Sequence, residues 1–200
     1  EAPQVFIVDD DPAVRDAISL WLECQGYTSR CFDDAEDFLS HYQPLMRGCI
    51  IADIRMPRMN GIELQAQLNQ RKCLLPLIFI TGHGTVPMAV EAMRHGALDY
   101  LRKPLDEQQL LQTIARAFVI DQTESEQQRA NLALQVQLNS LTKRELQVAT
   151  LVVDGLANKI IAANLNISER TVEVHRSNVM HKLQAKTLPQ LVKTFVAASS

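Results

Sequence analysis

Long apolar runs are scarce in this chain of 200 residues. No stretch approaches the about 20 consecutive apolar residues that a membrane-spanning helix needs, and no secretory segment opens the sequence. Cysteine is also scarce, and Cys24, Cys31, Cys49 and Cys73 form no C-x-x-C pair, which disfavours a metal or redox role. We expect reduced, mostly buried thiols in a cytoplasmic protein.

Glycine and proline are absent from one long segment, residues 106–140. Asp106 is a suitable helix N-cap, and the apolar residues up to Phe118 recur at helical spacing. The apolar pattern then fades and resumes at Leu132, so one long helix and two joined helices both fit. Because no flexible Gly/Ser stretch is present, we predict a helical linker over 121–140.

Charge is unevenly distributed along the chain, although the net charge is only −3. Residues 1–120 contain 11 Lys and Arg against 16 Asp and Glu, whereas residues 141–200 contain 8 against 4. This asymmetry predicts an acidic domain over 1–120 and a basic domain over 141–200, with the linker between them. The basic domain is the candidate for binding a polyanion.

The first 120 residues alternate short apolar runs with amphipathic segments. The runs cover 4–8, 28–32, 48–52, 77–80 and 99–102, and helical patterns cover 12–25, 35–43, 61–71 and 86–95. Repeated strand–helix units of this kind predict an α/β domain with a five-stranded parallel, doubly wound sheet. Any functional site is then expected at the carboxyl ends of the strands.

Chemically useful side chains follow four of these predicted strands. Asp9 and Asp10 follow the first strand, Asp53 the third, Thr81 the fourth and Lys103 the fifth. The strand ends share one edge of a parallel sheet, so these residues converge. Clustered carboxylates favour a hard divalent cation such as Mg²⁺. A carboxylate beside a cation, a hydroxyl and an ammonium is equipped to accept a phosphoryl group.

These residues belong to motifs that resemble the signature of response-regulator receiver domains. The motifs are Val8-Asp9-Asp10, Asp53-Ile54-Arg55-Met56-Pro57 with Asn60-Gly61, Thr81-Gly82-His83-Gly84, and Lys103-Pro104. The resemblance covers residues 4 to about 118 and implies the strand order 2-1-3-4-5. It also implies a cis Lys103-Pro104 bond, an isomer that is rare outside X-Pro.

The resemblance implies a role for the main residues of these motifs and for Tyr100. Asp53 is implied as the phosphoacceptor, with Thr81 and Lys103 on the phosphoryl oxygens. The metal ligands implied for Mg²⁺ are Asp9, Asp10, Asp53 and the backbone carbonyl of Arg55. Tyr100 matches an aromatic switch residue that turns inward when Thr81 moves.

Three alternatives remain open for parts of this cluster. Asp11 is either a helix N-cap, which we favour, or a third metal ligand. His83 is either a polar residue without a specific role or a residue that alters the lifetime of the phosphoryl group. An enzyme of the haloacid-dehalogenase type would need a second Asp two residues after the nucleophile, but Arg55 is there, so we predict that the chain is not an enzyme. A further alternative for the whole chain is a regulator that uses the domain only to dimerise.

The last 60 residues show no strand pattern and predict an all-α domain of four helices, near 143–154, 158–165, 169–183 and 187–197. Thr142 and Glu145 have the spacing of a capping box, and Ser168 caps the third helix. The segment Asn158–Arg176 resembles the LuxR-type helix-turn-helix of the NarL/FixJ family. Asn166 stands at the tight turn and tolerates a left-handed backbone.

Within this domain the third helix is the candidate for DNA recognition. The residues placed for phosphate contacts are Lys159, Arg170, Thr171, Arg176 and Lys182. By resemblance, the residues that face base edges are Glu173, Val174 and Ser177. Glu173 is equally well explained as a solvated charge, or as a partner of Arg170 or Arg176. Ile160 is apolar where the family usually has an acidic residue, so it is either part of an exposed patch used for an interface or a departure that is simply tolerated.

The whole resemblance implies a response regulator of a two-component system. Its implied partners are a sensor histidine kinase, promoter DNA, RNA polymerase and a second copy of the chain, which pairs through about 85–118 after phosphorylation. Activation of transcription is the expected outcome, and an aromatic-compound catabolic operon is a further expectation. The helical linker favours activation by dimerisation over masking of the DNA-binding helix.

Overall fold

The computed structural model describes residues 2–82 and 84–199. Contacts divide the chain into two compact units, residues 1–126 and residues 127–200. Each unit has its own hydrophobic core, so each is described separately. In the described part of the chain, no helix is both long enough and apolar enough to cross a membrane.

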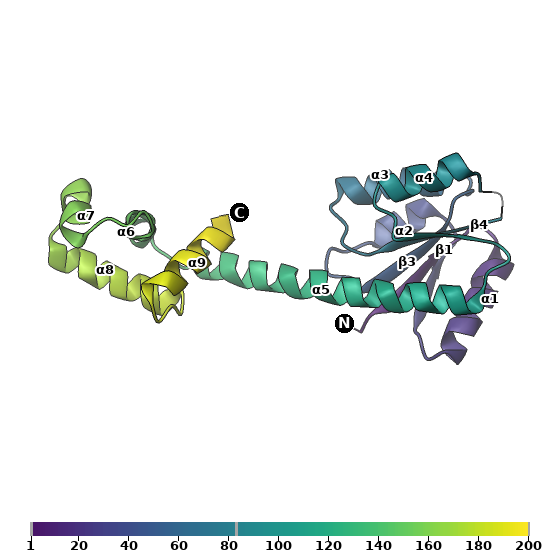
Figure 1. The fold of residues 1–200 in the computed structure, drawn as a ribbon, viewed down its shortest axis with the longest axis horizontal. Coiled ribbons are helices and arrows are strands. Elements are labelled where there is room, and N and C mark those ends of the chain that lie inside the picture. The colour runs from purple at the N-terminus through teal and green to yellow at the C-terminus, as the bar shows by residue number, and fades with distance from the viewer. Residues whose placement is uncertain (1, 83, 200) are drawn as a thin grey trace. The chain divides into compact units, whose positions relative to one another are not determined.

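The first unit is built on a parallel sheet of five strands (Figure 1). The strands are β1 (Gln4–Val8), β2 (Ser29–Phe32), β3 (Gly48–Asp53), β4 (Leu77–Thr81) and β5 (Asp99–Arg102). They lie in the order β2-β1-β3-β4-β5, and every adjacent pair is parallel. The predicted doubly wound topology and strand order are confirmed.

Helices cover both faces of this sheet (Figure 1). They are α1 (Pro12–Cys24), α2 (Ala35–His41), α3 (Gly61–Gln70), α4 (Val86–Arg94) and α5 (Glu107–Asn139). Alternate strand residues point to opposite faces, so that Phe6 and Val8 face α2 and α3 while Val5 and Ile7 face α1 and α5. Buried strands in such a sheet are apolar on both faces, which explains the continuous apolar runs in the sequence.

Helix α5 is continuous from Glu107 to Asn139, which selects the single-helix alternative. Its first part packs on the sheet through Leu110, Ile114 and Ala117. Farther along, the buried Asp121 carboxylate pairs with Arg47, with 2.9 Å between Oδ2 and Nε. An ion pair therefore attaches the helix to the first unit beyond the end of its apolar stripe.

The second unit contains α6 (Lys143–Val153), α7 (Asn158–Leu165), α8 (Glu169–Lys182) and α9 (Leu188–Ser199). Val172, Val179 and Leu183 are buried against α6 and α7. The turn between α7 and α8 passes through Asn166 at φ 51° and ψ 53°, a left-handed conformation that asparagine tolerates. Ser168 then caps α8 by accepting a hydrogen bond from the Thr171 backbone N–H.

The cysteine prediction is partly wrong. Cys49 is buried in β3 and Cys73 is half-buried, but Cys24 and Cys31 are exposed. Cys24 ends α1 on its solvent side, and Cys31 lies on β2, a strand at the edge of the sheet. An edge strand is covered less completely than a central one, and a sequence pattern alone does not identify the edge.

Candidate functional site

The carboxyl edge of the sheet brings together the side chains that the sequence placed at strand ends. Asp9 directly follows β1, Asp53 is the last residue of β3, Thr81 is the last residue of β4, and Lys103 directly follows β5. Adjacent strands are in register at these positions, with Val8 opposite Ala52 and Asp53 opposite Ile80. Residues from four strands therefore meet at one edge.

Lys103 joins the two buried carboxylates of this cluster. Its Nζ lies 2.8 Å from Oδ2 of Asp9 and 3.4 Å from Oδ1 of Asp53. Asp9 and Asp53 are both buried, so their charges are poorly solvated. One ammonium thus serves two carboxylates, and the cluster keeps a net negative charge.

This imbalance appears in the ionisation of Asp53. Burial raises the pKa of the Asp53 carboxyl, and neither the Lys103 charge nor the hydrogen bond from the Arg55 backbone N–H reverses the shift. For Lys103, burial acts to lower the pKa, but the hydrogen bond to Asp9 and the two carboxylate charges outweigh it and raise the pKa. The lysine therefore stays charged while Asp53 is left under-neutralised.

Backbone groups orient both carboxylates. The Arg55 N–H donates to Oδ2 of Asp53 over 2.8 Å, and the Asp11 N–H donates to Oδ1 of Asp9 over 2.9 Å. The Asp11 side chain accepts a hydrogen bond from the Ala13 backbone N–H and caps α1. The N-cap alternative for Asp11 is therefore confirmed.

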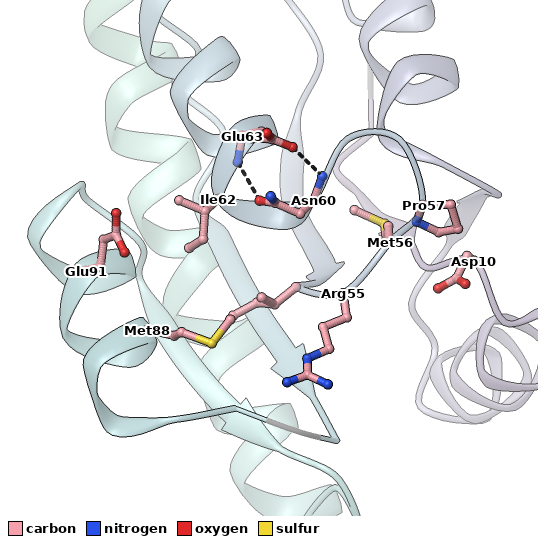
Figure 2. Close-up of a pocket in the computed structure, with 10 residues that line it drawn as sticks. Asp10, Arg55, Met56, Pro57, Asn60, Ile62, Glu63, Met88 and Glu91 are labelled. Atoms are coloured by element: carbon pink, nitrogen blue, oxygen red, sulfur yellow. Dashed lines mark hydrogen bonds between the residues drawn. The ribbon is translucent and has the colours of Figure 1, made fainter.

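A cavity of about 620 Å³ adjoins this edge. Figure 2 shows Asp10 and Glu91 on opposite sides of it, with the Arg55 side chain extending into the open space between them. Asn60 and Glu63 line it as well, and their side chains and backbone N–H groups form a reciprocal capping box at the start of α3. The capping box fixes the loop that leads from Asp53 to α3.

The donor set at this edge fits a magnesium ion. Among the described residues, no three Asp, Glu, His or Cys side chains are close enough to form a complete metal site. Magnesium, however, is held by one or two carboxylates and keeps several waters. The under-neutralised Asp9 and Asp53, the exposed Asp10 beside them and the Arg55 carbonyl supply oxygen donors of the required kind. The four predicted ligands stay a prediction.

Tyr100 lies beside Thr81 at the end of the cluster. The ring is half-buried against the core, and the position of Gly84 is so close that a Cβ atom there would meet both Tyr100 and Thr81. Burial raises the pKa of the Tyr100 hydroxyl.

The Lys103-Pro104 bond is cis, as predicted. His83 lies outside the described residues, so its two alternatives remain open.

In the second unit, the predicted base-reading residues share the exposed side of α8. Glu173, Val174 and Ser177 are all exposed, and Val174 is an apolar side chain in that position. Within the described residues Glu173 forms no ion pair, which disfavours its pairing with Arg170 or Arg176. Arg170 is exposed, as is Lys159 near the start of α7. These side chains are available to a ligand.

Two of the four cationic residues predicted to contact phosphate have hydrogen-bond partners on other segments of the protein. Arg176 donates from Nη1 to Oδ1 of Asn158 over 2.8 Å. Lys182 lies 2.7 Å from Oε2 of the buried Glu145 and also donates to the Ser140 carbonyl. Their roles in DNA binding stay predictions, and the structure gives each a contact between helices.

The Glu145–Lys182 pair was missed by sequence reasoning. The capping-box spacing identified Glu145 as a partner of Thr142, and the structure confirms that box. Nothing in the pattern connects residues 37 positions apart. The hydrogen bond from Lys182, followed by that from the Thr142 backbone N–H, lowers the pKa of Glu145 to about 2.

Comparison with known families matches each unit of the chain. The family described as "Response regulator receiver domain" matches residues 5–115. The family described as "Bacterial regulatory proteins, luxR family" matches residues 139–195. The two matches cover the carboxylate cluster and the α7–α8 pair, respectively.

Several known proteins are similar to this chain over nearly its whole length. The transcriptional regulatory protein FixJ of Rhizobium meliloti (strain 1021) is 44% identical over 194 residues, which cover 96% of this chain and 95% of that protein. The response regulator protein TodT of Pseudomonas putida (strain F1 and others) is 41% identical over 196 residues, covering 96% and 85%. Among solved structures, the response regulator StyR is 42% identical with a TM-score of 0.87, covering 98% of this chain and 99% of that one.

Proposed function

Because the chain belongs to the NarL/FixJ family of two-component response regulators, we propose that Asp53 accepts a phosphoryl group and that this event controls DNA binding by α8. The family consists of transcription regulators and not of enzymes. The observation that carries the proposal is the Lys103 ammonium shared between Asp9 and Asp53 at the carboxyl edge.

The phosphoryl donor in this proposal is a phosphohistidine of a sensor kinase. An oxygen of Asp53 attacks the phosphorus, a P–O bond forms, and the P–N bond to the histidine breaks. Lys103 neutralises one oxygen of the transferred group and Thr81 donates a hydrogen bond to another. Positioning and charge neutralisation are most of what phosphoryl transfer requires from a protein.

Asp9, Asp10, Asp53 and the Arg55 carbonyl would hold a magnesium ion at this site. The ion would complete the charge balance and would neutralise the phosphoryl oxygens. The residues around it keep Asp53 in place, since the Arg55 N–H holds one carboxylate oxygen and Lys103 approaches the other. Both oxygens are thus oriented before a donor arrives.

We propose that Thr81 and Tyr100 report phosphorylation to the face formed by α4, β5 and α5. This face carries exposed apolar side chains, Val86, Val90 and Met93, along α4. Exposed apolar patches of this kind fit a protein interface. Phosphorylation then favours a homodimer by shifting the balance between two arrangements of the face.

Dimerisation would place two α8 helices on two half-sites of promoter DNA. Glu173, Val174 and Ser177 face the bases, and the cationic residues with Thr171 contact phosphates. Those cationic residues are Lys159, Arg170, Arg176 and Lys182. Lys182 is held by Glu145, whereas Arg170 is exposed and forms no ion pair in the part of the chain that the structure describes, so we rank Lys182 below Arg170 as a phosphate contact. We further propose three functional parts, 1–120, 121–140 and 141–200.

Activation of transcription through RNA polymerase, and an aromatic-compound catabolic operon as the target, are finer proposals. Relatives with different names are similarly close, since FixJ, TodT and the tetrathionate response regulatory protein TtrR share 38–44% identity with this chain. Overall sequence similarity therefore does not identify the target operon. The residues on the exposed side of α8 would determine which promoter DNA is bound.

The test compares wild type with Asp53→Ala in full-length form, each with and without acetyl phosphate and Mg²⁺. We expect the donor to promote dimerisation and tighten binding to operator-length DNA in the wild type only. Asp16 on α1 is exposed and forms no ion pair with any described residue, so it offers a matched control, and Asp16→Ala should behave like the wild type. Equal DNA binding by all forms, with or without donor, would show that the first unit is a passive dimerisation module.

A further inference from the structure

We propose that Gly84 acts as a steric gate for Tyr100: the missing side chain at position 84 provides the space that the tyrosine hydroxyl occupies. The residue at this position would then set how readily the aromatic switch turns inward. The inference rests on the proposed function for its regulatory meaning, whereas the position of the ring can be tested independently.

The geometry at Gly84 leaves no room for a Cβ atom. An ideal Cβ built on Gly84 would lie 1.8 Å from Oη of Tyr100 and 2.7 Å from its Cζ. It would also lie 2.6 Å from Cγ2 of Thr81. Contacts this short are far inside van der Waals distance, so any side chain at position 84 must displace these neighbours.

The space around Gly84 differs from that around Gly26. Gly26 has φ 82° and open space around its Cβ position, and it is needed for its left-handed backbone at the end of α1. At Gly84 the side chains of Tyr100 and Thr81 occupy the place of a Cβ atom, so the obstruction is steric.

The Tyr100 side chain that obstructs a Cβ atom at Gly84 is not held at its hydroxyl end. Tyr100 is half-buried, and within the described residues its hydroxyl has no hydrogen-bond partner. The position of the ring end therefore depends on the space beside Gly84. Gly61 differs, because its Cβ would meet the Asp53 backbone carbonyl at 2.6 Å, where only a shift of the main chain could relieve the clash.

The same space adjoins both members of the proposed switch. Thr81 and Tyr100 each border the Cβ position of Gly84, from β4 and β5 respectively. A methyl group there would move the ring out of its observed position and thereby oppose the arrangement proposed to favour the dimer. Asp53 and Lys103 are not among the atoms nearest to this position, so acceptance of the phosphoryl group should persist.

The experiment uses Gly84→Ala in the full chain, labelled with 3-fluorotyrosine. The chain has three tyrosines, and Tyr100→Phe assigns the Tyr100 fluorine resonance. Gly82→Ala is the matched control, because a Cβ at Gly82 has nothing within 4 Å. We expect Gly84→Ala, but not Gly82→Ala, to shift the Tyr100 resonance toward that of a solvent-exposed tyrosine, without any phosphodonor.

With acetyl phosphate and Mg²⁺, Gly84→Ala should still become phosphorylated, while its dimer dissociation constant rises about tenfold or more. In a Tyr100→Ala background, adding Gly84→Ala should weaken the dimer no further. If Gly84→Ala does not fold, a folded Gly84→Ala/Tyr100→Ala double variant supports the clash, and an unfolded one overturns the gate.

An unmoved Tyr100 resonance in Gly84→Ala would overturn the gate, as would loss of phosphorylation, which would place the effect on Thr81. A shifted ring with unchanged dimerisation would overturn its regulatory role. If the proposed function is wrong, the wild type itself will take up no phosphoryl group. The comparison of Tyr100 fluorine resonances without donor will then still show whether the absence of a side chain at position 84 sets the position of the ring.

Discussion

Each unit of the chain contains a lysine that reaches a buried carboxylate on a distant element, and the two pairs differ in charge balance. In the first unit, Lys103 serves both Asp9 and Asp53. In the second, Lys182 serves Glu145, which also accepts a hydrogen bond from the Thr142 backbone N–H. The Lys103 ammonium is shared between two carboxylates, whereas the Lys182 ammonium pairs with one carboxylate.

The pKa shifts follow from this difference. Burial raises the pKa of Asp53 because the shared lysine does not compensate for lost solvation. The pKa of Glu145 falls to about 2 because the Lys182 and Thr142 hydrogen bonds outweigh burial. A fully compensated carboxylate stabilises the fold, whereas an under-compensated one is poised for a ligand. The Lys182–Glu145 and Lys103–Asp9 pairs have similar N–O distances, 2.7 and 2.8 Å. Their charge balance nevertheless distinguishes an ion pair that stabilises the fold from one at the proposed phosphorylation site.

Breaking the compensated pair should have the largest effect. We expect Glu145→Ala to lower the free energy of unfolding of the second unit by about 2–3 kcal/mol, since it removes the ion pair and half of the capping box. The value is below that of a fully buried pair because the Lys182 side chain is 33% exposed. Denaturation followed by circular dichroism at 222 nm measures it.

Fluorescence of Trp21, the single tryptophan, reports the first unit alone and should be unchanged in Glu145→Ala. Glu173→Ala is the matched control, because this glutamate is exposed, and it should change stability by less than about 0.5 kcal/mol. A change in the Trp21 transition, with the helical signal unaltered, would contradict the assignment of Glu145 to the second unit's stability.

Lowering the pH should gradually remove the contribution of the charged Glu145 carboxylate to the free energy of unfolding. The folded-state pKa of Glu145 lies below its ordinary value of 4.5, so its stabilisation is complete above pH 4.5 and is lost as the pH falls toward about 2. The difference in unfolding free energy between wild type and Glu145→Gln should therefore shrink across this window. A difference that stays constant from pH 6 to pH 2.5 would show that charge on Glu145 is not its source.

Magnesium should stabilise only the under-compensated cluster. At ten times its dissociation constant, Mg²⁺ should raise the free energy of unfolding of the first unit by about 1.4 kcal/mol, because it binds the folded state. Trp21 fluorescence in denaturant titrations measures the change. The Asp9→Asn/Asp10→Asn double variant should lose the effect, and an equal gain in that variant would place the ion elsewhere.

Neutralising Asp53 should have the smallest effect, and in the opposite direction to Glu145→Ala. Because burial raises the pKa of Asp53, its charged form is disfavoured in the folded state. In the presence of a chelator, we expect Asp53→Asn to raise the free energy of unfolding of the first unit. A loss of stability in the Trp21-monitored transition would mean that Lys103 compensates Asp53 fully.

Much of the fold was predictable because local signals agreed with one another. The strand–helix alternation predicted the parallel sheet, and caps at Asp11, Thr142 and Ser168 marked helix starts to within a residue. The turn at Asn166 was also predicted correctly. These features depend on a few neighbouring residues, and hydrophobic periodicity carries that information.

The sequence by itself determined the parallel α/β architecture, several helix starts and the convergence of Asp9, Asp53, Thr81 and Lys103 at one edge, because a parallel sheet places all its carboxyl ends together. Only the tertiary structure decided which carboxylates share an ammonium, which cysteines are exposed and what space Gly84 leaves for Tyr100. Those properties depend on distances between side chains far apart in the chain, and no local pattern encodes such distances.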